Sequence, residues 1–180
     1  MLSKIESLGG KVTSVSTYEK KRLLDKVEKL TGKLPTVYRD FLLYFGSTVK
    51  FSVMVLLKSL EPSPWADKKG YDAIEYLYGL SNTNDGYTLF EVINTYKNDF
   101  NMELIPIALS SGGNQICICI KGKKKETIWF WDHETNPAFD DDGKVSGLTL
   151  VAYDFKDFID KLVVDDDTSP SKAIGGYLDF

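Results

Sequence analysis

Apolar residues recur at helical spacing in two segments near the start of the chain. Before the first segment, Ser16 and Glu19 have the spacing of a capping box, and Gly32 follows it. In the second, Pro35 occupies a first-turn position and Gly46 follows the last apolar residue. The pattern therefore predicts two amphipathic helices, whose apolar faces consist of Leu23, Leu24, Val27 and Leu30, and of Tyr38, Phe41, Leu42 and Phe45.

Short apolar runs separated by turn-forming residues predict β-strands in much of the remaining chain. These runs are residues 51–57, 104–109, 115–121, 126–131 and 148–153. Residues 71–80 fit neither class clearly, and residues 89–100 form a third amphipathic stretch after a turn at Asp85-Gly86. Residues 116–120 are apolar at every position, which is typical of a central strand covered on both faces. The turns at 110–114 and 122–125 favour a meander.

The end of the pattern predicts a closing helix. Asp154 is a suitable N-cap, and Phe155, Phe158, Ile159 and Leu162 would face inward. We therefore expect an α+β fold, with N-terminal helices packed on a largely antiparallel sheet and a closing C-terminal helix. A single domain would cover residues 1–164, and the polar residues 165–180 would form a mobile tail. The residues expected in the core are Tyr38, Phe41, Phe45, Ile107, Ile116, Ile118, Ile120, Phe130 and Phe155.

Composition and charge narrow the possible partners. The chain has 180 residues, 43% of them hydrophobic, which is enough for one ordinary core. No signal-peptide pattern begins the sequence and its apolar runs are too short to cross a bilayer, so we expect a cytoplasmic protein with no membrane partner. A net charge of −4 argues against direct binding of nucleic acid. Residues 140–167 are the most acidic part, with nine Asp against three Lys.

Few residues offer catalytic or metal-binding chemistry. Cys117 and Cys119 would point to the same face of one strand, which favours two buried, reduced thiols over a disulfide or metal site. The single histidine, His133, lies in no triad pattern, and we expect local hydrogen bonds to satisfy it. Residues 140–143 (Asp-Asp-Asp-Gly) resemble a calcium loop, but Ala138 and Thr149 stand where carboxylates are required. We expect no cofactor, no metal and no enzymatic activity.

Two tryptophans share one face of a predicted strand. Trp129 and Trp131 would lie on the face opposite Ile128 and Phe130. Either a helix covers them, or they form a binding surface, since aromatic residues of this size are typical interface anchors.

With these elements placed, the chain resembles the SUKH superfamily. The residues that carry the resemblance are Leu34-Pro35, Tyr38, Phe41-Leu42 and Gly46, then Tyr78-Gly79-Leu80, Ile105-Pro106-Ile107-Ala108 with its Ser-Gly-Gly-Asn turn, residues 128–133, and Phe155 with Phe158. They span roughly residues 16–163. Most are apolar or turn-forming, so they identify a scaffold and not a site.

The resemblance implies a function. The superfamily includes fungal cell-wall-assembly regulators and bacterial immunity proteins that neutralise polymorphic toxins. It implies a non-enzymatic protein-binding module, either an immunity protein for a cognate toxin domain, such as a nuclease, or a regulatory scaffold. We expect the partner to contact the densest acidic loop and the residues close to it in sequence, namely Trp131, Asp132, His133, Asp140, Asp141 and Asp142.

Overall fold

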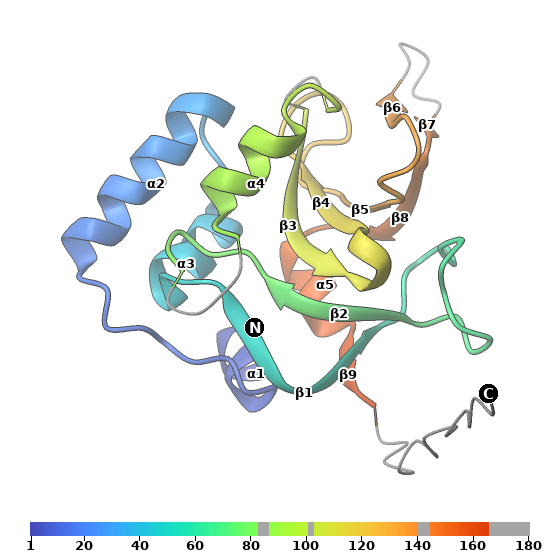
Figure 1. Cartoon of the computed structure of the whole chain (residues 1–180), viewed down its shortest axis with the longest axis horizontal. Coiled ribbons are helices and arrows are strands. Elements are labelled where there is room, and N and C mark those ends of the chain that lie inside the picture. Colours follow the sequence, from blue (N-terminus) through green and yellow to red (C-terminus); the bar gives the residue numbers. More distant parts are fainter. Residues whose placement is uncertain (83–86, 101–102, 140–144, 166–180) are drawn as a thin grey trace, which may run out of the picture.

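The computed structural model describes residues 1–82, 87–100, 103–139 and 145–165. Within these residues, α-helices pack against one face of a curled antiparallel sheet, which confirms the predicted α+β class (Figure 1). The helices are α1 (Leu2–Ser7), α2 (Thr17–Thr31), α3 (Thr36–Phe45), α4 (Leu89–Tyr96) and α5 (Phe155–Asp160). In α2, Ser16 Oγ accepts the Glu19 amide as predicted, while the Glu19 carboxylate binds Arg22.

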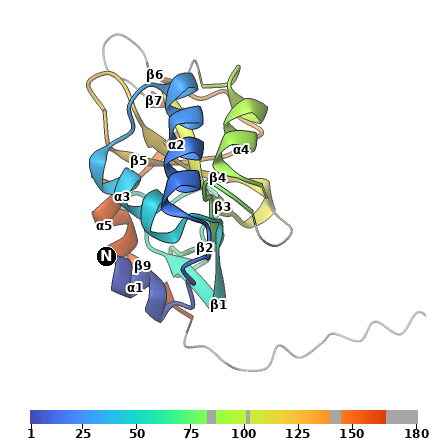
Figure 2. The same ribbon diagram turned by 90° about the vertical axis from the view of Figure 1, so that its left-hand side faces the viewer.

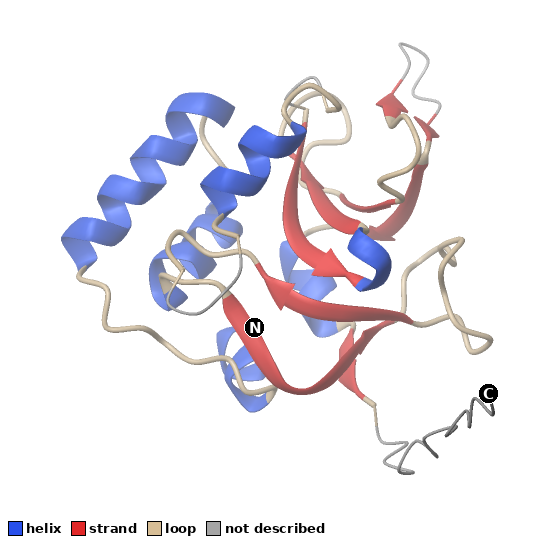
Figure 3. Cartoon of the chain, in the orientation of Figure 1, coloured by secondary structure: helices blue, strands red, loops and turns tan. Residues whose placement is uncertain are grey.

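The main sheet, whose strands are red in Figure 3, has the order β8-β5-β4-β3-β2-β1-β9, and every neighbouring pair is antiparallel. The predicted meander is confirmed, because β3, β4 and β5 are adjacent in sequence and in the sheet. The strands are β1 (Val49–Leu57), β2 (Asp72–Leu77), β3 (Leu104–Ser110), β4 (Gln115–Cys119), β5 (Ile128–Trp131), β8 (Leu148–Ala152) and β9 (Leu162–Val164). A separate hairpin consists of β6 (Ala138–Phe139) and β7 (Val145–Ser146).

The main core lies between the helices and one face of the sheet. Helices α2 and α4 contact each other over this core, as two views at right angles show (Figures 1 and 2). At its centre the ring centroid of Phe155 lies 4.9 Å from that of Tyr38 and 5.2 Å from that of Phe41. All nine predicted core residues are buried in this cluster, which confirms the apolar face assigned to α3 from spacing. The face assigned to α2 is confirmed at Leu24 and Val27, but Leu30 is 41% exposed and does not belong to it.

A second apolar cluster covers the other face of the sheet at the β8 end. Its buried members are Phe100, Leu104, Cys117, Cys119, Trp129 and Trp131, and Phe139 and Val145 of the β6–β7 hairpin pack against it. Every residue of β4 is therefore buried, as its uninterrupted apolar run predicts. Both cysteines are free and buried.

The closing helix is shorter than the spacing predicts, and Leu162 does not belong to it. Helix α5 ends at Asp160, and Leu162 begins β9, where it pairs with Leu57 of β1. Leu162 is still buried, because this pairing points its side chain into the same core. Strand β9 forms its backbone hydrogen bonds with β1, a strand more than a hundred residues earlier in the chain. In a longer α5, the same backbone groups would have bonded within the helix.

Candidate functional site

The turn between β3 and β4 has a tight, glycine-dependent conformation. It contains the 3-10 turn η1 (Ser111–Gly113), in which Gly112 and Gly113 have φ angles of 75° and 86°. These left-handed values favour glycine, because a side chain there would crowd its own backbone. The Ser110 amide donates a 2.8 Å hydrogen bond to the Asn114 carbonyl and closes the hairpin. The turn therefore presents backbone without side chains at its tip.

His133, in the loop after β5, lies against this turn. Its ring Nδ1 is 3.0 Å from Asn114 Oδ1, which also accepts the His133 amide at 3.4 Å. A methyl group added at Gly113 would lie 3.5 Å from the imidazole Cε1, which is ordinary van der Waals contact, so the ring lies directly beside the glycine. The imidazole is exposed and has the local hydrogen bonds predicted for it.

Trp65, in the long loop between β1 and β2, is the third contributor, and sequence reasoning missed it. Its side chain is 51% exposed, yet its indole Nε1 donates a 2.9 Å hydrogen bond to Asp132 Oδ2. A methyl group added at Gly112 would lie 3.5 Å from the indole ring. A large aromatic side chain in the polar segment Ser63-Pro64-Trp65 is the signal that could have identified it.

Asp132 joins two of the three loops. Its Oδ2 accepts from Trp65 and its Oδ1 accepts the Glu134 amide at 3.1 Å. Both carboxylate oxygens are therefore occupied, which orients the side chain. We call the resulting surface, made of Trp65, Gly112, Gly113, Asp132 and His133, the tryptophan surface. The structure thus brings the predicted residues Asp132 and His133 together with a tryptophan from a distant part of the sequence.

Trp131 is buried in the second apolar cluster and contributes no side chain to this surface. It is 2% exposed, and its ring centroid lies 4.5 Å from that of Phe100 and 5.1 Å from that of Tyr96. Its Nε1 donates to the Thr135 carbonyl at 3.0 Å, which ties the loop after β5 to the second apolar cluster. Trp129 and Trp131 are both covered, but not by a helix alone: Tyr96 of α4 packs on Trp131, and Phe139 of β6 packs on Trp129.

The remaining predicted partner-binding residues are Asp140, Asp141 and Asp142, and they lie outside the described residues. The segments that flank them, β6 and β7, pair with each other next to the second apolar cluster. Their role in binding therefore stays a prediction.

The tryptophan surface presents an exposed aromatic ring beside a carboxylate and an imidazole. A hollow of about 190 Å³ beside it is lined by Pro64, Phe130, Asp132, Thr135 and residues 147–149. The two thiols lie in the interior, where burial raises the pKa of Cys117 well above its ordinary value and so keeps it protonated. Among the described residues, no three His, Cys, Asp or Glu side chains are grouped closely enough to hold a metal ion.

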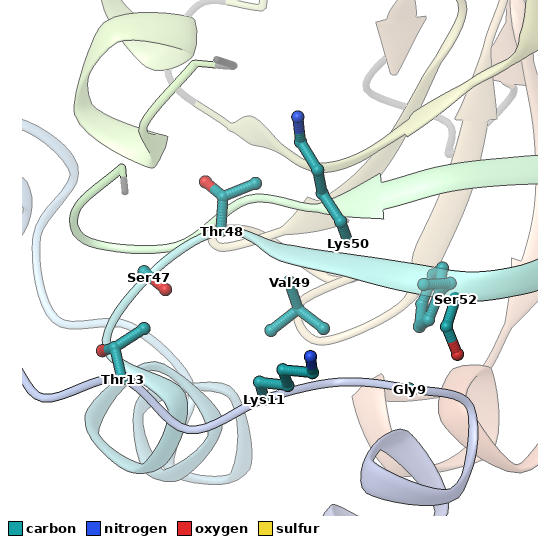
Figure 4. Close-up of a pocket in the computed structure, with 9 residues that line it drawn as sticks. Gly9, Lys11, Thr13, Ser47, Thr48, Val49, Lys50 and Ser52 are labelled. Atoms are coloured by element: carbon teal, nitrogen blue, oxygen red, sulfur yellow. The ribbon is translucent and has the colours of Figure 1, made fainter. Parts of the chain in front are cut away.

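A larger hollow, of about 340 Å³, lies where the segment after α1 crosses the start of β1 (Figure 4). Lys11 and Lys50 line it, but Lys50 extends away from Lys11, so the two charges do not converge on one point. The hydroxyls of Thr13 and Thr48 donate to the carbonyls of Phe45 and Tyr87. These contacts fasten neighbouring segments together and give the hollow no evident anion-binding geometry.

Across the part of the chain that is described, no helix is both long and apolar enough to span a membrane.

Comparison with known proteins agrees with the fold. The model of the SMI1/KNR4 family (SUKH-1) matches residues 20–161. A prophage SPbeta-derived uncharacterized protein of Bacillus subtilis (strain 168), YokK, is 35% identical over 179 residues, which cover 94% of this chain and 85% of the relative. The family match covers most of α2, all of α3, the sheet from β1 to β8, and helix α5. The chain therefore belongs to the SMI1/KNR4 (SUKH-1) family.

Proposed function

We propose that this protein is a bacterial immunity protein that binds a cognate toxin domain in the cytoplasm and neutralises it through the tryptophan surface. The observation that carries the proposal is the half-exposed ring of Trp65, held by the Asp132 carboxylate at 2.9 Å. Tryptophan is among the residues that contribute most to binding energy at protein interfaces. An exposed tryptophan that is already fixed loses little conformational freedom when a partner covers it.

The family supports a binding role. SUKH domains are generally non-enzymatic immunity or regulatory proteins, and they are associated with toxin partners. YokK is described as prophage-derived and uncharacterized, so it supports the kinship and names no partner. The engaged carboxylate of Asp132 and the buried thiols agree with binding, because neither is arranged as a base or a nucleophile.

The acidic charge of the chain favours a basic partner, such as a nuclease. The net charge is −4, and the exposed side chain of Glu134 and the carboxylate of Asp132 lie at the tryptophan surface. Opposite charges on two proteins accelerate their encounter and orient it. An inhibitor that must intercept a toxin quickly would gain from this steering.

The test is co-expression of the protein with toxin domains encoded by genes adjacent to its own. Cells that produce the toxin domain should survive with this protein and die without it. Trp65→Ala should raise the Kd by about 30-fold, since loss of an interface anchor costs about 2 kcal/mol or more. The matched control is Tyr18→Ala, which removes a 78% exposed aromatic side chain from the start of α2, away from the tryptophan surface.

Two results would contradict the proposal. If Trp65→Ala and Tyr18→Ala bind equally well while both remain folded, the interface lies elsewhere. If the protein neither binds nor protects against any adjacent toxin domain, the immunity function is wrong. In that case, the regulatory scaffold that the resemblance also implies becomes the better hypothesis.

A further inference from the structure

The face of the sheet opposite the main core is not covered along its whole length. The second apolar cluster covers it at the β8 end. At the other end a groove of about 690 Å³ runs along β1 and β9, and the loop before β2 forms its far wall. The groove is lined by Met54, Leu56, Tyr71, Val163 and Val164, with Asp67, Lys69 and Asp165 at its margin.

Several apolar side chains in the groove are exposed, although exposed apolar side chains at the edge of a sheet are unfavourable. Met54 is 62% exposed, Val163 40% and Val164 39%. Leu56 and Val163 are cross-strand partners, so they form one continuous apolar strip. Apolar patches of this kind at a sheet edge usually bind something, because they otherwise promote aggregation.

The chain itself continues from this groove. The Asp165 amide donates a 3.0 Å hydrogen bond to the Met54 carbonyl, so the last described residue lies at the groove margin. Fifteen residues follow it. Residues 166–172 (Asp-Asp-Thr-Ser-Pro-Ser-Lys) are polar. The description of the whole of residues 165–180 as polar does not hold for residues 173–180 (Ala-Ile-Gly-Gly-Tyr-Leu-Asp-Phe), which are mostly apolar and include Ile174, Tyr177, Leu178 and Phe180.

We propose that residues 173–180 bind in the groove of their own chain and cover Met54, Leu56 and Val163. The polar residues 166–172 are the linker. Seven extended residues span up to about 25 Å, which is ample for a segment tethered at the margin of its own binding site. This inference is independent of the toxin-binding proposal, because the tail and the groove belong to the same molecule.

Because the tail is tethered beside the groove, even a weak interaction between the two would keep the tail bound. Tethering through a short linker gives an effective concentration on the order of 1 mM, so a segment with a Kd of about 0.1 mM as a free peptide would be about nine-tenths bound when tethered. Other chains compete poorly at ordinary protein concentrations, which are far lower. The tail of the same chain is therefore the favoured occupant of the groove over a second copy.

The test uses the full chain with a nitroxide spin label at Asp179→Cys. Labelling is selective because Cys117 and Cys119 are buried. In two-dimensional NMR spectra, the amide signals of Met54 and Val163 should lose intensity, while those of α2 should keep it. The control carries the same label with Leu178→Ser and Phe180→Ser, which remove apolar contacts and leave the linker unchanged. In this control the signals of Met54 and Val163 should recover.

Three outcomes would overturn the inference. The first is a label that leaves Met54 and Val163 unaffected. The second is intensity loss that persists in the Leu178→Ser/Phe180→Ser control, which would reflect proximity of the linker alone. The third is intensity loss in an unlabelled ¹⁵N-enriched chain mixed with a spin-labelled chain, which would assign the groove to the tail of a second copy.

Discussion

Tyr38 buries a hydroxyl in the aromatic centre of the main core. Its ring is fully buried, and the part of the chain that is described offers its oxygen no hydrogen-bond partner. Burial also raises the pKa of Tyr38 well above its ordinary value, so the group stays neutral. Tyr78 is equally buried, but its hydroxyl donates to Gln115 Oε1 at 2.8 Å. The two tyrosines therefore form a natural comparison.

Tyr38→Phe should increase the free energy of unfolding by about 1 kcal/mol, because it removes a buried polar atom that has no partner. Tyr78→Phe should instead decrease it by about 1 kcal/mol or more, because it leaves Gln115 without its bond. Urea unfolding of the two variants measures both effects. Equal destabilisation by both would show that the Tyr38 hydroxyl has a partner in solution.

Asp72 should make stability depend on pH. Its carboxyl is buried behind the loop that carries Trp65, and burial raises its pKa above the ordinary value of 3.8, although the 2.6 Å hydrogen bond from Ser63 acts in the opposite direction. Because the folded state binds this proton more tightly than the unfolded state, Asp72 decreases the stability of the fold as pH rises from 3.8 through the raised pKa.

Asp72→Asn removes this titration and keeps an oxygen that can accept from Ser63. Relative to the parent chain, the variant should therefore gain stability as pH rises through that interval. Unfolding midpoints measured in urea across the interval test the prediction. A constant difference between the two proteins at every pH would contradict it.

The candidate site could be predicted only in part, because some of its residues are neighbours in the sequence and others are far apart. Asp132 and His133 were identified because they follow a strand next to an acidic segment. Trp65 is 67 positions away from Asp132 along the chain, so no local pattern joins the two. Trp131 was assigned a surface role because the alternation of residues along a strand shows which of them share a face. It does not show whether another part of the chain covers that face.

At the level of elements, helices and strands could be predicted when they are long and when the residues that define them lie close together in the sequence. Helices α2 and α3 were predicted because capping residues and apolar spacing act within a few residues. The hairpin β6–β7 and strand β9 were missed because they have two or three residues each, and α1 because it has six. Strand β9 also depends on pairing with β1, which no nearby residue indicates.

Gly79 is the point at which three segments cross. A methyl group added there would lie 1.9 Å from the Ser47 carbonyl carbon, while the Gly79 amide and carbonyl bind Thr48 Oγ1 and the Leu89 amide. Gly79→Ala should therefore decrease the free energy of unfolding by about 3 kcal/mol, at the upper end of overpacking costs.

Gly70→Ala is the matched control for this prediction. Gly70 has a φ angle of 83° and no atom within 4 Å of an added methyl group, so its substitution tests backbone strain without a collision. That variant should lose about 1 kcal/mol. Thermal unfolding of the two variants distinguishes the effects. If Gly79→Ala is no more destabilising than Gly70→Ala, the three segments around Gly79 pack less tightly than the structure indicates.

At the level of the whole molecule, charge should control how fast the partner is bound. Replacing Asp140, Asp141 and Asp142 with Asn changes the net charge from −4 to −1. If these residues border the interface, association with the toxin domain should be slower and less sensitive to salt, while dissociation changes little. Stopped-flow measurements at several salt concentrations test this.

Asp25→Asn with Asp40→Asn is the control, since both aspartates are exposed on helices α2 and α3. This control measures how much association slows for each negative charge removed away from the acidic loop. Should the control slow association as much for each charge as the triple substitution does, the acidic loop would have no special position relative to the partner.

The pairing of β9 with β1 has a consequence for the time at which the protein becomes available in the cell. Val55 of β1 is made early in translation, but its partner Val164 is among the last described residues to leave the ribosome. The hydrogen bond from Lys4 Nζ to the Asp160 carbonyl, at 2.6 Å, likewise joins the first helix to the last. The sheet edge therefore cannot be complete until β9 has been synthesised and has left the ribosome. Until then β1 presents unpaired backbone groups to neighbouring chains, so the wait for β9 is an interval in which this edge is open to aggregation.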